Sequence, residues 1–249
     1  MREAVKIRKA EEASGLSEVS VRELRPSPRD FQFAISSRRA YVVRIAGVLR
    51  CDPSLGFRRS DLDVTSLAHA AALAGAGAVA IGTDLHLFGG RIDELHAVAG
   101  ALTVPVLRLD YALDVRQLYT SRLAHADAVL VSAGMLDVPH LLRLQEAARS
   151  MGMQVVFESR DEADLARALQ VNGAIHGLGD LTGETGLWEP ARVLALVQQI
   201  PARSTVIALS GVRTAADLNA LHGHVDAALI TAPWLGAPDP LSAAALFAE

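Results

Sequence analysis

Several side chains able to do acid, base or nucleophile chemistry stand at the ends of apolar runs in this chain. Glu158 closes the run Gln154–Glu158, and we interpret it either as a general base or substrate anchor, or as a carboxylate paired with a nearby arginine. His176 lies in another apolar run, where a hydrogen-bonded structural histidine is favoured over a proton donor. Cys51 has no identifiable helper residue, so we interpret it as a small buried residue rather than a nucleophile.

A second group of polar residues lies in the stretch Asp84–Gly90. It follows the apolar run Ala78–Thr83 and precedes an amphipathic run, which is the pattern of a buried strand, a loop and a helix. The loop after the strand is where such units keep their chemistry. His86 stands beside Asp84, but a metal site needs two or three convergent ligands and the sequence supplies no others here. We therefore expect no metal and no cofactor.

The same unit repeats along the chain and must position these residues. Apolar runs that fit buried strands cover residues 41–49, 78–83, 104–109, 127–132, 154–158, 174–178, 205–210 and 226–231. Helical runs cover residues 64–73, 92–101, 115–124, 139–151, 163–169, 190–199, 215–221 and 239–248. Eight such units in about 250 residues predict the α/β class and a (β/α)8 TIM barrel. The alternative is a doubly wound open sheet, but no GxGxxG follows the first strand.

We expect a single barrel domain over residues 1–249, with an N-terminal helical extension at 1–40 and the barrel at 41–249. The extension has helical stretches at 3–13 and 29–35, and we expect it to lie outside the barrel or over its mouth. Its charged start does not resemble a secretory signal.

Composition excludes several classes of function. The 249 residues are 51% apolar and carry a net charge of −4, which offers no general attraction for nucleic acid or an anionic membrane. A single cysteine excludes an intramolecular disulfide, and no run reaches the ~18 apolar residues of a membrane span. We expect a cytoplasmic protein whose partner is a small molecule.

Eight segments together resemble the indole-3-glycerol phosphate synthase family, a tryptophan-pathway (β/α)8 barrel. They match in order over nearly the whole chain, and eight in register are strong evidence of ancestry. The segments are Pro28–Phe31, Asp52–Gly56, Thr83–Gly90, Val104–Tyr111, Phe157–Glu158 with Asp161–Glu162, Gly179–Leu181, Ser210–Val212 and Ala237–Pro240.

The resemblance implies catalytic positions that this chain has changed. The family's two lysines fall on Leu49 and Leu109, and two of its glutamates on Gly47 and Leu209. Its strand 6 asparagine falls on either Gly177 or Leu178. Leucine cannot protonate a carbonyl or a leaving hydroxyl, and losing one acid–base group typically costs ~10²–10⁴ in rate. We therefore expect a more apolar barrel mouth than the family has, and without the lysines we favour the arginine-paired interpretation of Glu158.

The resemblance also implies substrate-binding positions, which are Phe88, Ser54, Ser210, Gly211, Thr231 and Ala232. Glu158, Ser210, Gly211 and Phe88 persist, but the phosphate-binding Gly-Ser turn here reads Thr231-Ala232-Pro233, and proline supplies no N–H. Asp52 replaces a serine and would repel a nearby phosphate unless Arg50 offsets its charge. We expect phosphate binding that is weakened rather than abolished.

Three functional hypotheses follow. The first is a divergent, non-catalytic family member that binds a ligand, phosphorylated or not, at the barrel mouth. The second is an enzyme with a changed reaction on a less charged substrate, using Glu158 with His176 or Asp110; the ordinary synthase at low activity belongs beside it. The third is a binding partner of another enzyme, which predicts an exposed apolar patch.

Overall fold

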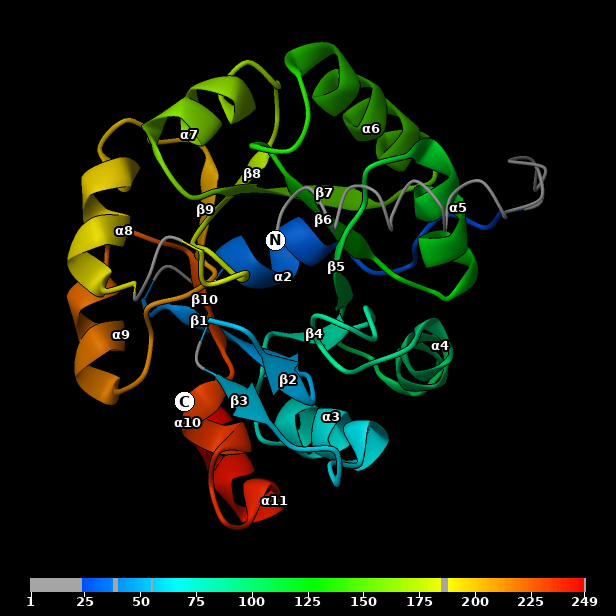
Figure 1. The fold of residues 1–249 in the computed structure, drawn as a ribbon, viewed down its shortest axis with the longest axis vertical. Coiled ribbons are helices and arrows are strands. Elements are labelled where there is room, and N and C mark those ends of the chain that lie inside the picture. The colour runs from blue at the N-terminus through cyan, green and yellow to red at the C-terminus, as the bar shows by residue number, and fades with distance from the viewer. Residues whose placement is uncertain (1–23, 38–39, 55, 185–187, 249) are drawn as a thin grey trace.

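The protein is described from a computed structural model, which covers residues 24–37, 40–54, 56–184 and 188–248. Eight parallel strands close into a barrel with helices outside it (Figure 1), in the order β1-β10-β9-β8-β7-β6-β5-β4. The strands are β1 Val43–Val48, β4 Ala78–Gly82, β5 Val106–Tyr111, β6 Ala128–Ser132, β7 Gln154–Ser159, β8 Ile175–Leu178, β9 Thr205–Ala208 and β10 Ala227–Ile230. The predicted (β/α)8 TIM barrel is confirmed, and the doubly wound alternative is wrong.

Helices connect the strands and cover the outside of the barrel. They are α3 Val64–Leu73, α4 Ile92–Ala101, α5 Val115–Leu123, α6 Val138–Ser150, α7 Glu162–Ala168, α8 Pro190–Val197, α9 Ala215–Leu221, α10 Ala232–Leu235 and α11 Pro240–Ala243. Aspartates begin several of them: the Asp137 and Asp161 side chains accept hydrogen bonds from backbone N–H groups of α6 and α7. Each cap fixes the residue at which its helix begins, directly after a loop of the barrel mouth.

The ends of several elements differ from the sequence expectation by one or two residues, and the last predicted helix also changes type. The third predicted strand begins at Val106 rather than Val104, because Pro105 has no N–H to donate and the Val106 N–H is taken by the Asp127 carboxylate at 2.7 Å. The last predicted helix, 239–248, is instead α11 followed by the tight 3₁₀ turn η2, Ala244–Phe247. Phe247 packs edge-on against Trp234 there, with ring centroids 5.1 Å apart.

A short antiparallel hairpin, β2 Cys51–Asp52 with β3 Phe57–Arg58, follows β1 and was missed by the sequence pattern. Each strand has only two residues, too few to show alternation. The hairpin lies at the barrel mouth and is tied there by the loop after β4, whose Phe88 carbonyl accepts the N–H groups of Arg50 and Cys51.

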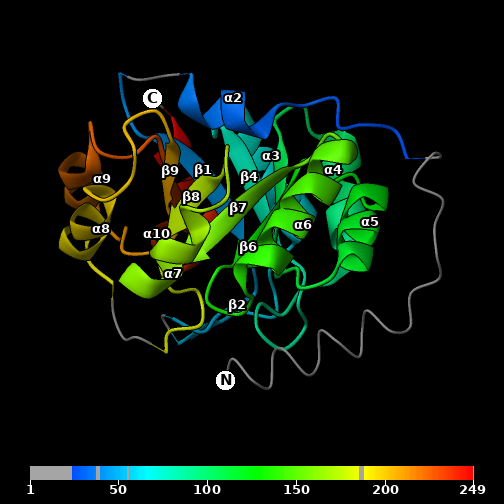
Figure 2. The ribbon, with the colours of Figure 1, turned by 90° about the horizontal axis from the view of Figure 1, so that it is seen from above.

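The described part of the N-terminal extension closes the other end of the barrel. Helix α2, Phe31–Ser36, and β2 lie at opposite ends of the molecule (Figure 2). Gln32 donates to Thr205 at the start of β9, and the N–H of Phe31 donates to Gln154 at the start of β7. Of the two expected places, outside the barrel or over its mouth, the second is therefore wrong for this helix. The stretch predicted at 3–13 lies outside the described residues.

Candidate functional site

Glu158 near the end of β7 faces the barrel interior and has no exposed surface. Its Oε1 accepts the hydroxyl of Tyr111 at 2.8 Å and the N–H of Leu181 at 3.2 Å. Its Oε2 has no hydrogen-bond partner among the described residues. No described arginine forms an ion pair with Glu158, so the favoured arginine-paired interpretation is wrong, and the side chain is a buried acid held by a phenol and a backbone amide.

Burial makes Glu158 a group that titrates near neutral pH. Loss of hydration disfavours the charged form and raises its pKa from 4.5 to about 7; hydrogen bonds from Leu181 and Tyr111 act in the opposite direction, and the charge of Asp180 adds to the rise. Burial, followed by the charge of Glu158, raises the pKa of Tyr111 well above 10, so the phenol stays a neutral donor. A carboxyl in this state can both give and accept a proton at pH 7.

The two predicted helpers of Glu158 lie elsewhere. Gly177 pairs with Glu158 across β7 and β8 and His176 pairs with Phe157, so His176 points to the opposite face of the sheet. Burial lowers the pKa of His176 to about 4, and its Nδ1 has no hydrogen-bond partner among the described residues. The expected hydrogen bond is therefore absent at this nitrogen. Asp110 also faces outward, and its Oδ2 lies 2.7 Å from Arg108.

The positions where catalytic side chains were predicted to be lost are apolar and filled. Leu49, Leu109 and Leu209 are each at most 2% exposed. A Cβ at Gly47 would collide with the side chain of Thr231. Leu209 fills the corresponding space at the inward-facing Gly177, where its Cδ1 would lie 2.5 Å from an added Cβ.

These substitutions are therefore sterically coupled. Neighbouring side chains occupy the volume that longer polar side chains would need at Gly47 and Gly177. A longer side chain at Gly47 or Gly177 would therefore have to displace the side chain of Thr231 or Leu209.

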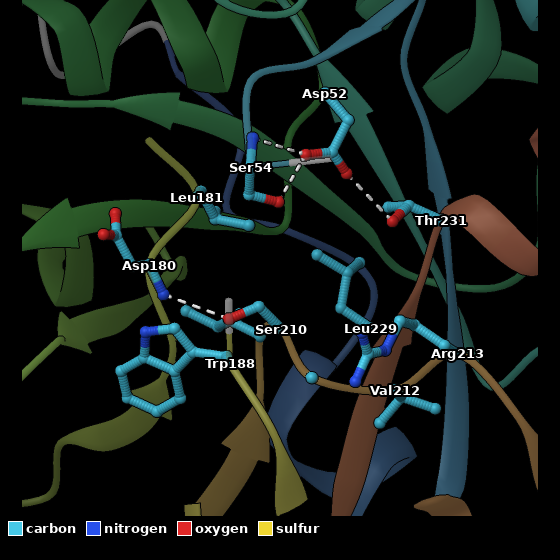
Figure 3. A pocket seen from close by; sticks show the side chains of 12 residues that line it. Asp52, Ser54, Asp180, Leu181, Trp188, Ser210, Val212, Arg213, Leu229 and Thr231 are labelled. Atoms are coloured by element: carbon cyan, nitrogen blue, oxygen red, sulfur yellow. Dashed lines mark hydrogen bonds between the residues drawn. The ribbon is translucent and has the colours of Figure 1, made fainter. Parts of the chain in front are cut away.

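A pocket opens at the mouth between the hairpin and the loops after β8, β9 and β10 (Figure 3). The space between its atoms, about 460 Å³, includes open solvent, so the pocket is a partly open depression. Four predicted binding residues, Ser54, Ser210, Gly211 and Thr231, line it together. The remaining lining residues are Asp52, Asp180, Leu181, Trp188, Leu209, Val212, Arg213 and Leu229.

Three other predicted site residues do not line this pocket. Phe88 is buried over Gly82, where its Cβ would lie 2.6 Å from an added Cβ, so it packs inside the mouth. Glu158 lies behind the lining residue Leu181, whose N–H it accepts. Ala232 is the first residue of α10.

Arg50 does not offset the charge of Asp52, so the condition under which Asp52 would not repel a nearby phosphate is not met. The Arg50 guanidinium lies 2.7 Å from Glu94 and also donates to the carbonyl of Leu62. Asp52 instead accepts hydrogen bonds from Ser54 and Thr231.

Sequence reasoning missed Tyr111, Asp180, Trp188 and Arg213. Tyr111 and Asp180 were inside quoted segments at strand ends, and alternation from the buried Leu109 would have turned Tyr111 inward. The described residues contain no group of three or more potential metal ligands, and none of their helices has the length and apolar character to cross a bilayer.

A closed barrel of eight parallel strands with a pocket at its carboxyl end defines a TIM-barrel protein. The profile of the family described as indole-3-glycerol phosphate synthase matches residues 1–244, and the chain belongs to this family.

Named relatives agree with this assignment. The chain is 35% identical to indole-3-glycerol phosphate synthase of Albidiferax ferrireducens, over 91% of this chain and 87% of the relative. It is 34% identical to that of Mycolicibacterium gilvum, over 92% and 85% of the two chains.

Solved structures support the fold alone. The barrel superimposes on 3-hexulose-6-phosphate synthase from Salmonella typhimurium with a TM-score of 0.65 at 18% identity, covering 83% of this chain and 96% of that one. Tryptophan synthase subunit alpha from Legionella pneumophila gives 0.59 at 14% identity, covering 82% and 89%.

Proposed function

We propose that this family member has lost the standard ring closure and decarboxylation and instead binds a small molecule at the barrel mouth. The observation that carries the proposal is the apolar, filled interior at Leu49, Leu109 and Leu209. A reaction that needs a proton donor at those places has none there, because leucine has no titratable group. The chain has only two lysines, Lys6 and Lys9, and both lie outside the described residues.

The test is turnover of 1-(2-carboxyphenylamino)-1-deoxyribulose 5-phosphate by the purified full chain, followed by the appearance of the indole chromophore. We expect no rate above a protein-free blank and no rescue of a tryptophan auxotroph. Turnover that is removed by Lys6→Met or Lys9→Met would refute the proposal and identify the amine responsible. Turnover unaffected by both variants would refute it equally.

An enzyme with a changed reaction is a second candidate, favoured by the state of Glu158. Its raised pKa is what a general acid–base carboxyl needs. Tyr111 takes the place of the helpers expected from the sequence, since its hydroxyl donates to Oε1.

This candidate is tested by carboxyl infrared spectroscopy of the wild type and Glu158→Gln. A protonated carboxyl band at pH 6 that disappears in the variant supports it. Its absence from the wild type would remove the basis for acid–base chemistry at this residue.

The remaining expectations stay predictions. A cytoplasmic location, and partners restricted to small molecules or another protein, rest on the sequence alone. The scaffold hypothesis requires one exposed apolar patch, but Phe33 on α2 and Leu85 after β4 stand at opposite ends of the barrel, 69% and 53% exposed. These two side chains therefore do not contribute to a common patch.

A further inference from the structure

The carboxylate of Asp52 lies inside the pocket and accepts hydrogen bonds from the nearby donors. It is 5% exposed, and its Oδ1 accepts the Ser54 N–H at 3.0 Å and the Ser54 hydroxyl at 2.6 Å. Its Oδ2 accepts the Thr231 hydroxyl at 3.1 Å. Figure 3 shows these bonds reaching Asp52 from the hairpin side and from the end of β10. The hydroxyls of Ser54 and Thr231, which line the pocket, are thus already bonded to a carboxylate of the chain itself.

The other charges of the pocket do not reverse this balance. Asp180 is a second carboxylate beside the pocket, but its Oδ1 lies 3.9 Å from the buried Arg160 and accepts the N–H and the hydroxyl of Thr182. Arg213 is the cation among the lining residues; its side chain is 40% exposed and its Nη2 lies 3.9 Å from Glu189. Asp52 is therefore the pocket carboxylate that has no arginine partner among the described residues.

The uncharged walls indicate what else the ligand must offer. Apolar surface comes from Leu181, Leu209, Leu229 and the buried Trp188, which line the same pocket as Asp52. Apolar walls with a few convergent polar groups fit a ring or short hydrocarbon body that carries one oriented polar group. The acceptor oxygens of Asp52 select a donor for that group.

We propose that Asp52 occupies the place of a ligand's anion, so that this pocket takes an unphosphorylated small molecule with an apolar ring and an amine or hydroxyl donor directed at Asp52. The inference rests on the proposed function, because a protein that no longer acts on a phosphorylated substrate does not need a phosphate-binding site. A phosphate monoester entering the pocket would meet a like charge and hydroxyls that are already bonded. An ammonium group would instead gain a charge-assisted hydrogen bond.

The experiment titrates the full chain with three probes by calorimetry: inorganic phosphate, 2-phenylethylamine and 3-phenylpropionate. The two organic probes share a ring and differ in the charge of the polar end. The wild type is expected to bind the amine at least about tenfold more tightly than the carboxylate, and to show no saturable phosphate binding. Asp52→Ser, which restores a neutral donor, is expected to bind phosphate at least about tenfold more tightly than the wild type and to lose the preference for the amine.

Two further variants keep the result interpretable. Asp61→Asn removes the same charge from an exposed residue bonded to Arg59, so it should behave as the wild type with all three probes. Asp52→Asn preserves the shape of Asp52 if the serine variant fails to fold, and should lose the amine preference.

Saturable phosphate binding by the wild type would overturn the inference. A preference for the amine that persists in Asp52→Ser or Asp52→Asn would also overturn it. Its failure is distinct from failure of the proposed function, which depends on turnover. A chain that binds phosphate but does not turn over the phosphorylated substrate would refute only the inference.

Discussion

Replacing Glu158 with glutamine should remove a destabilisation that depends on pH. Burial raises the pKa of Glu158 from 4.5 to about 7, so the folded chain holds a proton that the unfolded chain releases between those pH values. A group with a raised folded pKa contributes its full stability below the unfolded pKa and loses it as pH rises through the folded pKa. A gap of about 2.5 pH units, at about 1.36 kcal/mol for each, corresponds to about 3 kcal/mol.

Glutamine keeps an oxygen that can accept from Tyr111 and Leu181 but carries no charge. Relative to the wild type, the free energy of unfolding of Glu158→Gln should therefore rise by about 3 kcal/mol between pH 4.5 and pH 8. His176 acts in the opposite sense: its folded pKa is lowered to about 4 from 6.5, so its contribution is lost as pH falls. The two slopes oppose each other in the wild type, so the difference between the proteins is the quantity to measure.

Urea denaturation of both proteins at steps from pH 4.5 to 8.5 provides that difference. The matched control is Glu162→Gln, an exposed carboxylate in the first turn of α7, where no buried charge is relieved. In thermal unfolding the gain at pH 8 corresponds to roughly 6–12 °C for a chain of this size. A difference between Glu158→Gln and the wild type that stays constant across the pH range would refute the burial argument.

Three further predictions concern stability and are measured by chemical denaturation. Leu109→Lys should cost about 3–5 kcal/mol because it buries an unpaired charge, whereas Leu109→Met should cost less than about 1.5; equal costs would contradict an apolar interior. Asp127→Asn should cost about 3–5 kcal/mol, since Arg29, 2.7 Å away, loses its buried partner, and a loss below 1 would contradict this. Gly90→Ala should cost about 3 kcal/mol because its Cβ would collide with the carbonyl of Gly82. Gly100→Ala has open space around it and should raise the free energy of unfolding by about 0.5–1 kcal/mol. The reverse order would refute the steric reasoning.

The local pattern of the chain was enough to predict the barrel. Buried parallel strands need continuous apolar runs, and the runs at 78–83 and 127–132 correspond to β4 and β6 within one residue at each end. The segments from Pro28 to Pro240 were enough to identify the family. The two-residue strands of the hairpin left no comparable signal.

The contacts of the candidate site depend on strands that are distant in sequence. Glu158 meets Tyr111 across 47 residues and Thr231 meets Asp52 across 179, and no local pattern encodes either pair. Closure of the barrel sets which strand ends become neighbours, and strand register decides which side chains share a face.

The sequence by itself determined the fold, the family and the leucines at positions where the family keeps proton donors. The tertiary structure decided that the interior closed over those positions, that Glu158 is held by Tyr111, and that Asp52 accepts the hydroxyls of Ser54 and Thr231. The physical reason is the distance along the sequence over which each kind of interaction acts. Periodicity and propensity act over a few residues, whereas burial, pKa and hydrogen-bond partners are properties of whatever the closed barrel brings into contact.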